Sequence, residues 1–304
     1  MSVIDWLMEG DPAIRWQTMR DLARQPARVV AGERGRVASE GWGARLLALQ
    51  DADGQWGGGP YSPKWVSTTY TLLLLRHLGI DPADQQVQEA VGRVRDGVMM
   101  TKTKPFFGYM GETCITGMAL ALSAYFGGAE SHQAQVDYLL EQQRADGGWN
   151  CETSSSRSSF HTTISVLEGL LEHEHENPGL ATADARDRGH DYLLDRRMFR
   201  SLSSGEVVNR RWMLFSFPPR WYYDVLRGLE YLRDAGLAPD ERAEEAIALV
   251  ESKPDRDGRW PLQNPHRGRE HFQMEDGAGK PSRWNTLRAL RVIHWFRGDS
   301  SRGD

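Results

Sequence analysis

The sequence has few cysteines, no excess of positive charge and no long apolar run. Only Cys114 and Cys151 occur among its 304 residues, which is more typical of a reducing cytoplasm than of a secreted fold stapled by disulfides. The net charge of −5 disfavours nucleic acid as a partner, because a phosphate-binding face needs an excess of Lys and Arg. No stretch approaches the ~20 apolar residues of a transmembrane helix, and no signal-peptide core follows Met1. We therefore expect a soluble, cytoplasmic protein.

Motifs that mark several common enzyme classes are also missing. Neither a P-loop nor a G-x-G-x-x-G fingerprint occurs, which argues against nucleotide binding. The polar run 153–159 contains no G-x-S-x-G elbow, so a serine hydrolase of that type is disfavoured. The run Glu172-His173-Glu174-His175-Glu176 is rich in metal-binding side chains, but it precedes Asn177-Pro178. We interpret it as the solvated end of a helix.

The sequence does contain an alternation of amphipathic and fully apolar helical segments. The amphipathic segments are residues 33–50, 83–97, 133–143, 183–196 and 241–250. The apolar segments, which we expect to be buried on nearly all sides, are residues 67–78, 113–126, 162–171, 222–232 and 285–296. A further helix is expected at residues 14–22, and no convincing strand pattern appears.

Internal repeats predict how these helices are arranged. Gly-rich turns carrying a tryptophan recur at Trp56, Trp149 and Trp260, and six repeats of about 50 residues account for the chain. The prediction is an all-α fold in one domain over residues 1–304, an (α/α)6 toroid with two concentric rings of helices. An open superhelical solenoid is the alternative, but it would expose apolar edges. Residues 261–282 lack periodicity and are a candidate lid loop.

The turns resemble a known repeat. The series Gln50…Gly54…Trp56 and Gln143…Gly147-Gly148-Trp149 is similar to the glutamine–tryptophan (QW-type) motif of squalene and other triterpene cyclases. The toroid of the protein prenyltransferase β-subunit is similar too. The resemblance implies structural roles, in which the Gln ties one outer helix to the next and the Trp fills the turn.

The same resemblance implies a zinc site. The cyclase motifs D-x-D-D and D-D-x-x-D are absent, which disfavours an ordinary carbocation cyclase. Prenyltransferase β-subunits hold zinc with an Asp-x-Cys pair and a later His, and here Glu112-Thr113-Cys114 and His161 open successive apolar helices. Cys151 would be a fourth ligand or a neighbouring thiol, and a carboxylate, a thiolate and an imidazole suit catalytic zinc. The alternatives are a metal-free Cys/His or Glu/His site, in which Cys114 can be a nucleophile, or a purely structural Cys114 and His161.

A second cluster of residues lies at the starts of the apolar helices. Aromatic walls with a few oriented polar groups are the usual make-up of a ligand pocket, although bulky side chains can also simply plug a ring of helices. The predicted substrate-binding residues are Trp65, Phe160, Arg220, Trp221, Tyr222, Arg283, Trp284 and Asn285.

The resulting hypothesis is an enzyme with an axial aromatic pocket that acts on a small, largely apolar, prenyl-like or terpene-like molecule. Glu112, Cys114 and His161 would act through zinc in transfer, hydrolysis or elimination, and Tyr223 and Asp224 would transfer protons. One alternative is a metal-free acid/base lyase, isomerase or cyclase on a terpenoid. The other is a protein that binds a hydrophobic ligand or acts as a scaffold without turnover. The sequence does not indicate an oligomeric state.

Overall fold

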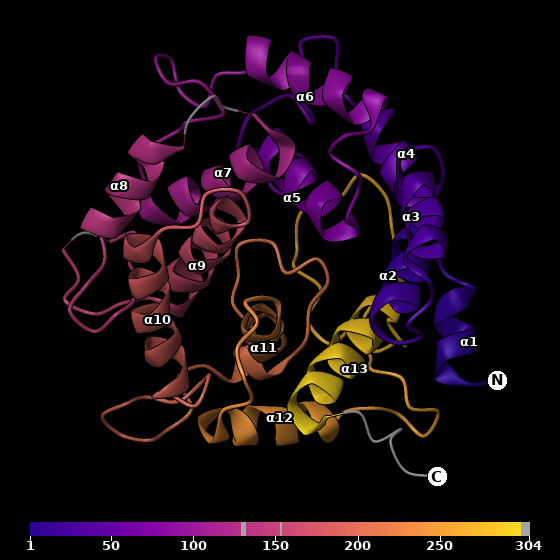
Figure 1. The fold of residues 1–304 in the computed structure, drawn as a ribbon, viewed down its shortest axis with the longest axis vertical. Coiled ribbons are helices and arrows are strands. Elements are labelled where there is room, and N and C mark those ends of the chain that lie inside the picture. The colour runs from indigo at the N-terminus through magenta and orange to yellow at the C-terminus, as the bar shows by residue number, and fades with distance from the viewer. Residues whose placement is uncertain (129–131, 153, 299–304) are drawn as a thin grey trace. The chain divides into compact units, whose positions relative to one another are not determined.

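The protein is all-α, as predicted. The computed structural model describes residues 1–128, 132–152 and 154–298, and within them only isolated bridges occur in place of β-strands. The α-helices, drawn in Figure 1, are α1 (Val3–Met8), α2 (Pro12–Asp21), α3 (Ala27–Gly35), α4 (Gly41–Leu47), α5 (Thr68–Leu78), α6 (Gln85–Gly97), α7 (Thr113–Phe126), α8 (Gln133–Glu141), α9 (Phe160–Glu174), α10 (Leu180–Leu194), α11 (Val225–Asp234), α12 (Glu244–Glu251) and α13 (Arg283–Arg297). None of the helices in these residues is long and apolar enough to cross a membrane.

The chain folds as two compact units. The first comprises Met1–Glu33, Asp191–Arg267 and Gln273–Asp304, and the second comprises Arg34–His190 and Gly268–Phe272. The predicted single domain, and the closure of the helices into a toroid, stay predictions.

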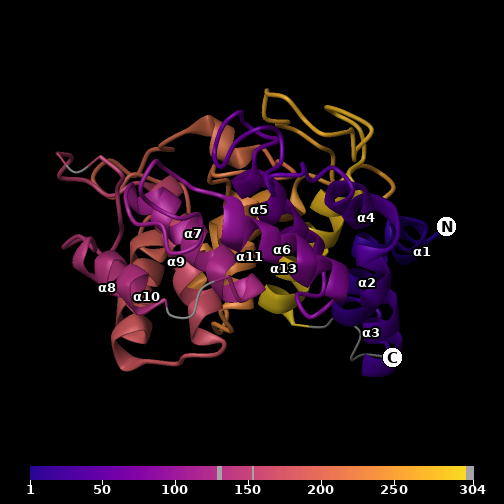
Figure 2. The same cartoon turned by 90° about the horizontal axis from the view of Figure 1, so that it is seen from above.

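The second unit is built around the pair α7 and α9, which lie side by side in Figures 1 and 2. Both helices are apolar almost all round, and nearly every residue of α7 is buried. Their backbones approach closely at glycines, since a β-carbon on Gly117 would lie 2.7 Å from the carbonyl oxygen of Ser165. Both helices begin near Cys151, which therefore marks one shared end of the pair.

The three tryptophan turns share one set of contacts. Each buried indole N–H donates a hydrogen bond to the carbonyl oxygen ten residues earlier, in the pairs Trp56–Leu46 (2.7 Å), Trp149–Leu139 (2.7 Å) and Trp260–Val250 (2.8 Å). Each backbone N–H donates to a threonine hydroxyl on the next apolar helix, in the pairs Trp56–Thr68, Trp149–Thr163 and Trp260–Thr286. The tryptophans are thus packing groups that fix each turn to the helices on either side.

The two glutamines of these turns join neighbouring amphipathic helices. Gln50, just after α4, donates to the carbonyl oxygen of Ala90 on α6 at 2.9 Å. Gln143, just after α8, donates to that of Ala185 on α10 at 2.7 Å. These are the contacts that the family resemblance implies for the glutamine. The third turn has Pro254 at the equivalent position and does without this bond.

The first unit places α2, α11 and α13 around buried ion pairs. Arg291 of α13 contacts Asp21 of α2 at 2.7 Å and Glu230 of α11 at 3.3 Å. Arg288, one turn earlier, contacts Glu230 at 2.6 Å. The two arginine side chains are only 3% and 5% exposed. Each buried positive charge therefore needs a carboxylate beside it to offset the free-energy cost of removing it from water.

The structure differs from the predicted helices at two places. The segment 33–50 is not one helix but α3, a 3-10 turn (Arg36–Ala38) and α4, and the break precedes Gly41, whose φ is +64°. Helix α1, which no prediction included, begins at Val3. Ser2 caps it, and the Ser2 hydroxyl accepts the N–H of Asp5 in a capping box.

Backbone hydrogen bonds join the two ends of the predicted lid loop 261–282. Leu262 N–H donates to Lys280 O at 2.9 Å and Ser282 N–H donates to Trp260 O at 2.8 Å. Motion of this loop stays a prediction.

Candidate functional site

The two cysteines are paired rather than free. Cys114 lies in the first turn of α7, and Cys151 follows the Trp149 turn. Their sulfurs form a disulfide across a Cα–Cα distance of 5.9 Å. The expectation that two cysteines in this chain would be reduced thiols is therefore wrong for this structure. The cause is the packing of α7 on α9, which brings residue 114 to the loop that precedes α9.

The sequence-predicted zinc ligands partly converge. Ligand atoms of Glu112, Cys114 and Cys151 lie within 4.8 Å of one another, and His161 does not belong to this group. A disulfide sulfur carries no negative charge and is a poor zinc ligand, so in this state only the exposed Glu112 carboxylate suits the metal. With the disulfide reduced, the set would offer two thiolates and a carboxylate, which fits a three-ligand zinc site.

Helix ends and hydroxyl groups surround Cys151. Its sulfur accepts the N–H of Cys114 at 3.1 Å and the hydroxyl of Thr162 at 3.4 Å. His161, half-buried, lies next to Thr162 in the first turn of α9. Hydrogen-bond donors at a helix N-terminus favour a thiolate over a thiol, and the sulfur of Cys151 accepts two such bonds.

The predicted substrate-binding residues of the second unit, Trp65 and Phe160, are buried aromatic side chains. Trp65 is 4% exposed, and its ring meets Tyr70 edge to face at 4.8 Å. Its backbone N–H donates to Arg269 O at 2.9 Å. Phe160 is also 4% exposed and is the first residue of α9. Both contribute to packing where they lie, and their predicted contact with a substrate stays a prediction.

In the first unit, Tyr223 and Asp224 have structural partners. Tyr223 is buried, and its hydroxyl donates to Met198 O at 2.5 Å. Burial raises the pKa of Tyr223 well above its usual value. Asp224 caps α11 by accepting Arg227 N–H at 2.8 Å, and it also accepts Ser216 N–H at 3.3 Å. Burial raises the pKa of Asp224 as well. A role for either group in proton transfer stays a prediction.

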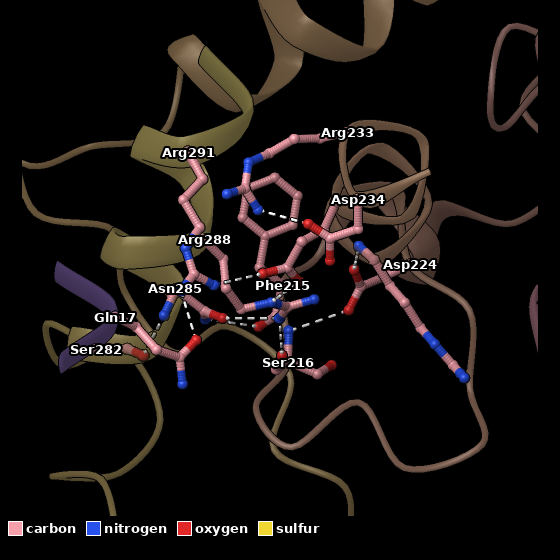
Figure 3. A network of polar contacts seen from close by, with 12 residues as sticks. Gln17, Phe215, Ser216, Asp224, Arg233, Asp234, Ser282, Asn285, Arg288 and Arg291 are labelled. Atoms are coloured by element: carbon pink, nitrogen blue, oxygen red, sulfur yellow. Dashed lines mark hydrogen bonds and ion pairs between the residues drawn. The ribbon is translucent and has the colours of Figure 1, made fainter. Parts of the chain in front are cut away.

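Figure 3 shows how this capping carboxylate joins the surrounding polar network. Arg288 donates to Ser216 O at 2.8 Å, so residue 216 is held by Asp224 from one side and Arg288 from the other. Asn285, predicted to bind substrate, donates to Pro261 O at 3.1 Å and to Phe215 O at 3.4 Å. Its side-chain amide thus connects α13 to two loops.

The remaining predicted residues form two aromatic groups in this unit. Trp221, Tyr222 and His266 stack in series, with ring centroids 4.5 Å and 4.3 Å apart. Arg220 precedes them with a φ of +59° and is 6% exposed. Trp284 stacks on Phe217 at 4.3 Å, whereas Arg283 turns to α1 and donates to Trp6 O at 3.0 Å.

Sequence reasoning missed one titratable group beside these rings. Glu275 lies in the loop 261–282 and accepts hydrogen bonds from the Ser282 hydroxyl at 2.8 Å and from Trp284 N–H at 3.2 Å. Burial, opposed by these hydrogen bonds, raises its pKa from 4.5 to about 7. A carboxyl group that titrates near neutral pH can both donate and accept a proton under physiological conditions. Its position in an aperiodic loop nine residues before Trp284 is the sequence feature that would have drawn attention to it.

No family model and no curated protein matches the chain. Among solved structures, the chain is similar to a protein from Actinoplanes, with 16% identity and a TM-score of 0.44 over 95% of this chain and 90% of the other. It is also similar to a type II terpene cyclase from Scytonema, solved in complex with geranylgeranyl dihydroxybenzoate. That match has 15% identity and a TM-score of 0.42 over 93% of this chain and 85% of the cyclase.

Proposed function

We propose that this chain is an enzyme that moves protons on a small, largely apolar, terpene-like molecule without a metal. The observation that carries the proposal is the position of the Glu275 carboxyl group, which is half-buried and accepts hydrogen bonds from the Ser282 hydroxyl and from Trp284 N–H. Burial raises the pKa of this group to about 7. A general acid or base works best when its pKa lies near the working pH, and such a group contributes about 10²–10⁴-fold to the rate. The reaction would be an isomerisation or a cyclisation. It would begin with protonation of a carbon–carbon double bond and end with loss of a proton from the resulting carbocation, so that the product is an isomer of the substrate.

Stacked aromatic rings beside Glu275 support this assignment. Trp284 donates its backbone N–H to the Glu275 carboxyl group and packs its ring on Phe217. The face of an aromatic ring attracts positive charge. The two rings are buried, at 1% and 6% exposure, so a substrate would have to displace part of their packing before they could stabilise the cationic character of a protonated alkene.

Glu275 is better suited to this role than the two groups predicted from the sequence. Asp224 accepts two backbone N–H groups as a helix cap, and Tyr223 donates its hydroxyl to a carbonyl oxygen. Proton transfer by either would break a contact that holds α11 or its preceding loop. Glu275 accepts from a hydroxyl and a backbone N–H, and both bonds stabilise the carboxylate left after it gives up a proton.

Zinc chemistry is the second candidate. The observation in its favour is the group Glu112, Cys114 and Cys151, whose ligand atoms lie within 4.8 Å. These residues would hold the ion after reduction of the disulfide, with His161 at the start of the neighbouring helix as the predicted further ligand. Bound zinc would supply a Lewis acid or an activated water or thiol.

A substrate screen with matched variants tests both candidates. Squalene, geranylgeraniol, a prenylated phenol and geranylgeranyl diphosphate would be incubated with the protein, with and without dithiothreitol, and the products analysed by mass spectrometry. The metal-free assignment predicts isomeric products without reductant, lost at least 100-fold in Glu275→Gln and retained in Glu270→Gln, another carboxylate of the same loop.

The other outcomes separate the alternatives. Activity that requires dithiothreitol and one equivalent of zinc, and that is lost in Cys151→Ser, would replace the metal-free assignment by the zinc one. Binding of a prenyl compound without product formation in any condition would favour the ligand-binding or scaffold alternative.

A further inference from the structure

A cavity in the second unit lies away from all the groups described above. It has a volume of about 680 Å³ and is lined by the end of α7, by α8, by the end of α9 and by the start of α10. His132 and His173 line it from two sides. The sequence placed His173 in a solvated charged run, but the structure buries it to 8% exposure. The reason is that the last turn of α9 packs its His173 face towards α8, while His175 stays on the outside.

The two imidazole rings lie close enough together to share one ion. Their centroids lie 5.7 Å apart, and their planes are inclined by 83°. Two imidazoles bound to one ion through bonds of about 2.1 Å have centroids about 5 to 6 Å apart when the bond angle lies near the tetrahedral value. The spacing therefore requires no movement of either helix.

One ring nitrogen on each histidine is buried without a partner. His132 Nε2 and His173 Nδ1 are enclosed, and neither finds a hydrogen-bond partner in the described part of the chain. The His132 ring is bonded instead to the backbone of Ser123, which leaves Nδ1 as its donor and Nε2 with a free lone pair. Metal-binding histidines usually donate their other N–H to a carbonyl group in this manner. Burial lowers the pKa of both histidines, so both rings are neutral and able to ligate.

Carboxylate groups lie in the same cavity, although in the described residues none of them forms a three-ligand group with the two histidines. Glu176 and Asp137 line the same cavity, and the charge of Glu176 acts on the His132 ring. Glu174 is paired with Arg186 through one carboxylate oxygen, and its other oxygen is buried without a hydrogen-bond partner in the described residues. Two imidazoles with a nearby carboxylate are a common ligand set for borderline transition metals.

We propose that His132 and His173 form a binding site for a divalent transition-metal ion, with zinc as the reference ion and water in the remaining coordination positions. The site would join the start of α8 to the end of α9. Its chemistry does not depend on the function proposed above, because its residues are separate from Glu275 and from the two cysteines.

Metal titration of the tag-free full-length protein tests this site. The protein would be stripped with EDTA and titrated with ZnCl₂ against a chromophoric chelator in the absence of reductant, so that the paired cysteines do not compete. Wild type should bind one equivalent, and His132→Gln and His173→Gln should each weaken binding at least tenfold. His175→Ala, two residues from His173 and exposed, is the matched control and should change the affinity less than twofold. Titration with Co²⁺ provides a second readout, since nitrogen ligation gives a visible absorption band that both glutamine variants should lose.

Three results would overturn the proposal: no bound zinc in wild type, an undiminished affinity in His132→Gln, or an equal loss in His175→Ala. Circular dichroism of each variant identifies any folding defect. Should His173→Gln fail to fold, His132→Gln decides alone, because its ring is only half-buried and its replacement is milder. A zinc equivalent that is lost in Glu112→Gln would place the ion at the cysteine loop and would likewise overturn the assignment.

Discussion

A β-carbon added to Gly117 would lie 2.7 Å from the carbonyl oxygen of Ser165, so α7 and α9 are in backbone contact at this point. Only glycine permits that distance, and Gly169 meets the backbone of Gly117 from the other helix in the same way. This close contact fixes the ends of both helices, and with them the loop that carries Cys151.

Replacement of Gly117 by alanine should therefore destabilise the protein. Overpacking of a tight core contact costs about 1–3 kcal/mol, and the better helix propensity of alanine offsets about 1 kcal/mol. We expect a net loss of up to about 2 kcal/mol, measured by urea unfolding. Gly32→Ala is the control, because Gly32 lies inside α3 with no atom near its β-position, and it should gain up to about 1 kcal/mol. Equal effects of the two substitutions would contradict the close contact.

The helices were predictable from the sequence because apolar periodicity and caps are local properties. The ranges of α5, α6, α7 and α13 agree with the predicted ones to within about two residues. The tryptophan turns were recognisable as well, since each has glycine shortly before the Trp. The threonine that bonds each Trp was not predictable, because it follows the Trp at a different distance in each turn. The break before α4 was missed because the segment's apolar pattern continues through Gly41.

The candidate sites were harder to predict, because they depend on contacts between segments distant in sequence. Nothing local indicates that residues 114 and 151 meet, and their pairing depends on how closely α7 and α9 pack. The same holds for His173, whose burial results from α8 rather than from its own charged run. Glu275 was missed because its raised pKa arises from burial of the loop on α13, a property that composition does not encode.

The threonine that supports each tryptophan turn provides a second prediction. In Thr163→Val the buried backbone N–H of Trp149 loses the hydroxyl oxygen to which it donates at 2.9 Å. An unsatisfied buried donor costs about 1–3 kcal/mol, and valine otherwise preserves the shape. The loss should appear in urea unfolding, whereas Thr103→Val at an exposed position should stay within about 0.5 kcal/mol of wild type.

The third prediction concerns the buried ion pairs of the first unit. Glu230→Gln removes the charge that compensates Arg288 and Arg291, and breaking a buried pair on one side costs about 3–5 kcal/mol. The exposed pair Arg36–Glu40 provides the matched control, because Glu40→Gln should cost less than about 1 kcal/mol. A small effect at Glu230 would mean that water reaches the two arginines.

The fourth prediction concerns pH and Glu275. Its pKa in the folded protein, about 7, lies above the ordinary value of 4.5, so the folded state binds the proton more tightly than the unfolded state. The stabilisation is complete below about pH 4.5 and is lost as the pH rises through about 7. The shift corresponds to at most about 3 kcal/mol, and partial exposure of the side chain reduces the amount.

Glu275→Gln keeps the shape and removes this proton equilibrium. Compared with wild type, the variant should lose less stability between pH 4.5 and 7, and it should be the more stable protein at pH 8. Urea unfolding at a series of pH values measures the difference, and a ¹³C titration of the carboxyl carbon locates the midpoint directly. The exposed Glu141→Gln should follow the wild-type curve. A midpoint near 4.5 would remove Glu275 as a proton-transfer group at neutral pH, because an ordinary carboxylate would then have no proton to give.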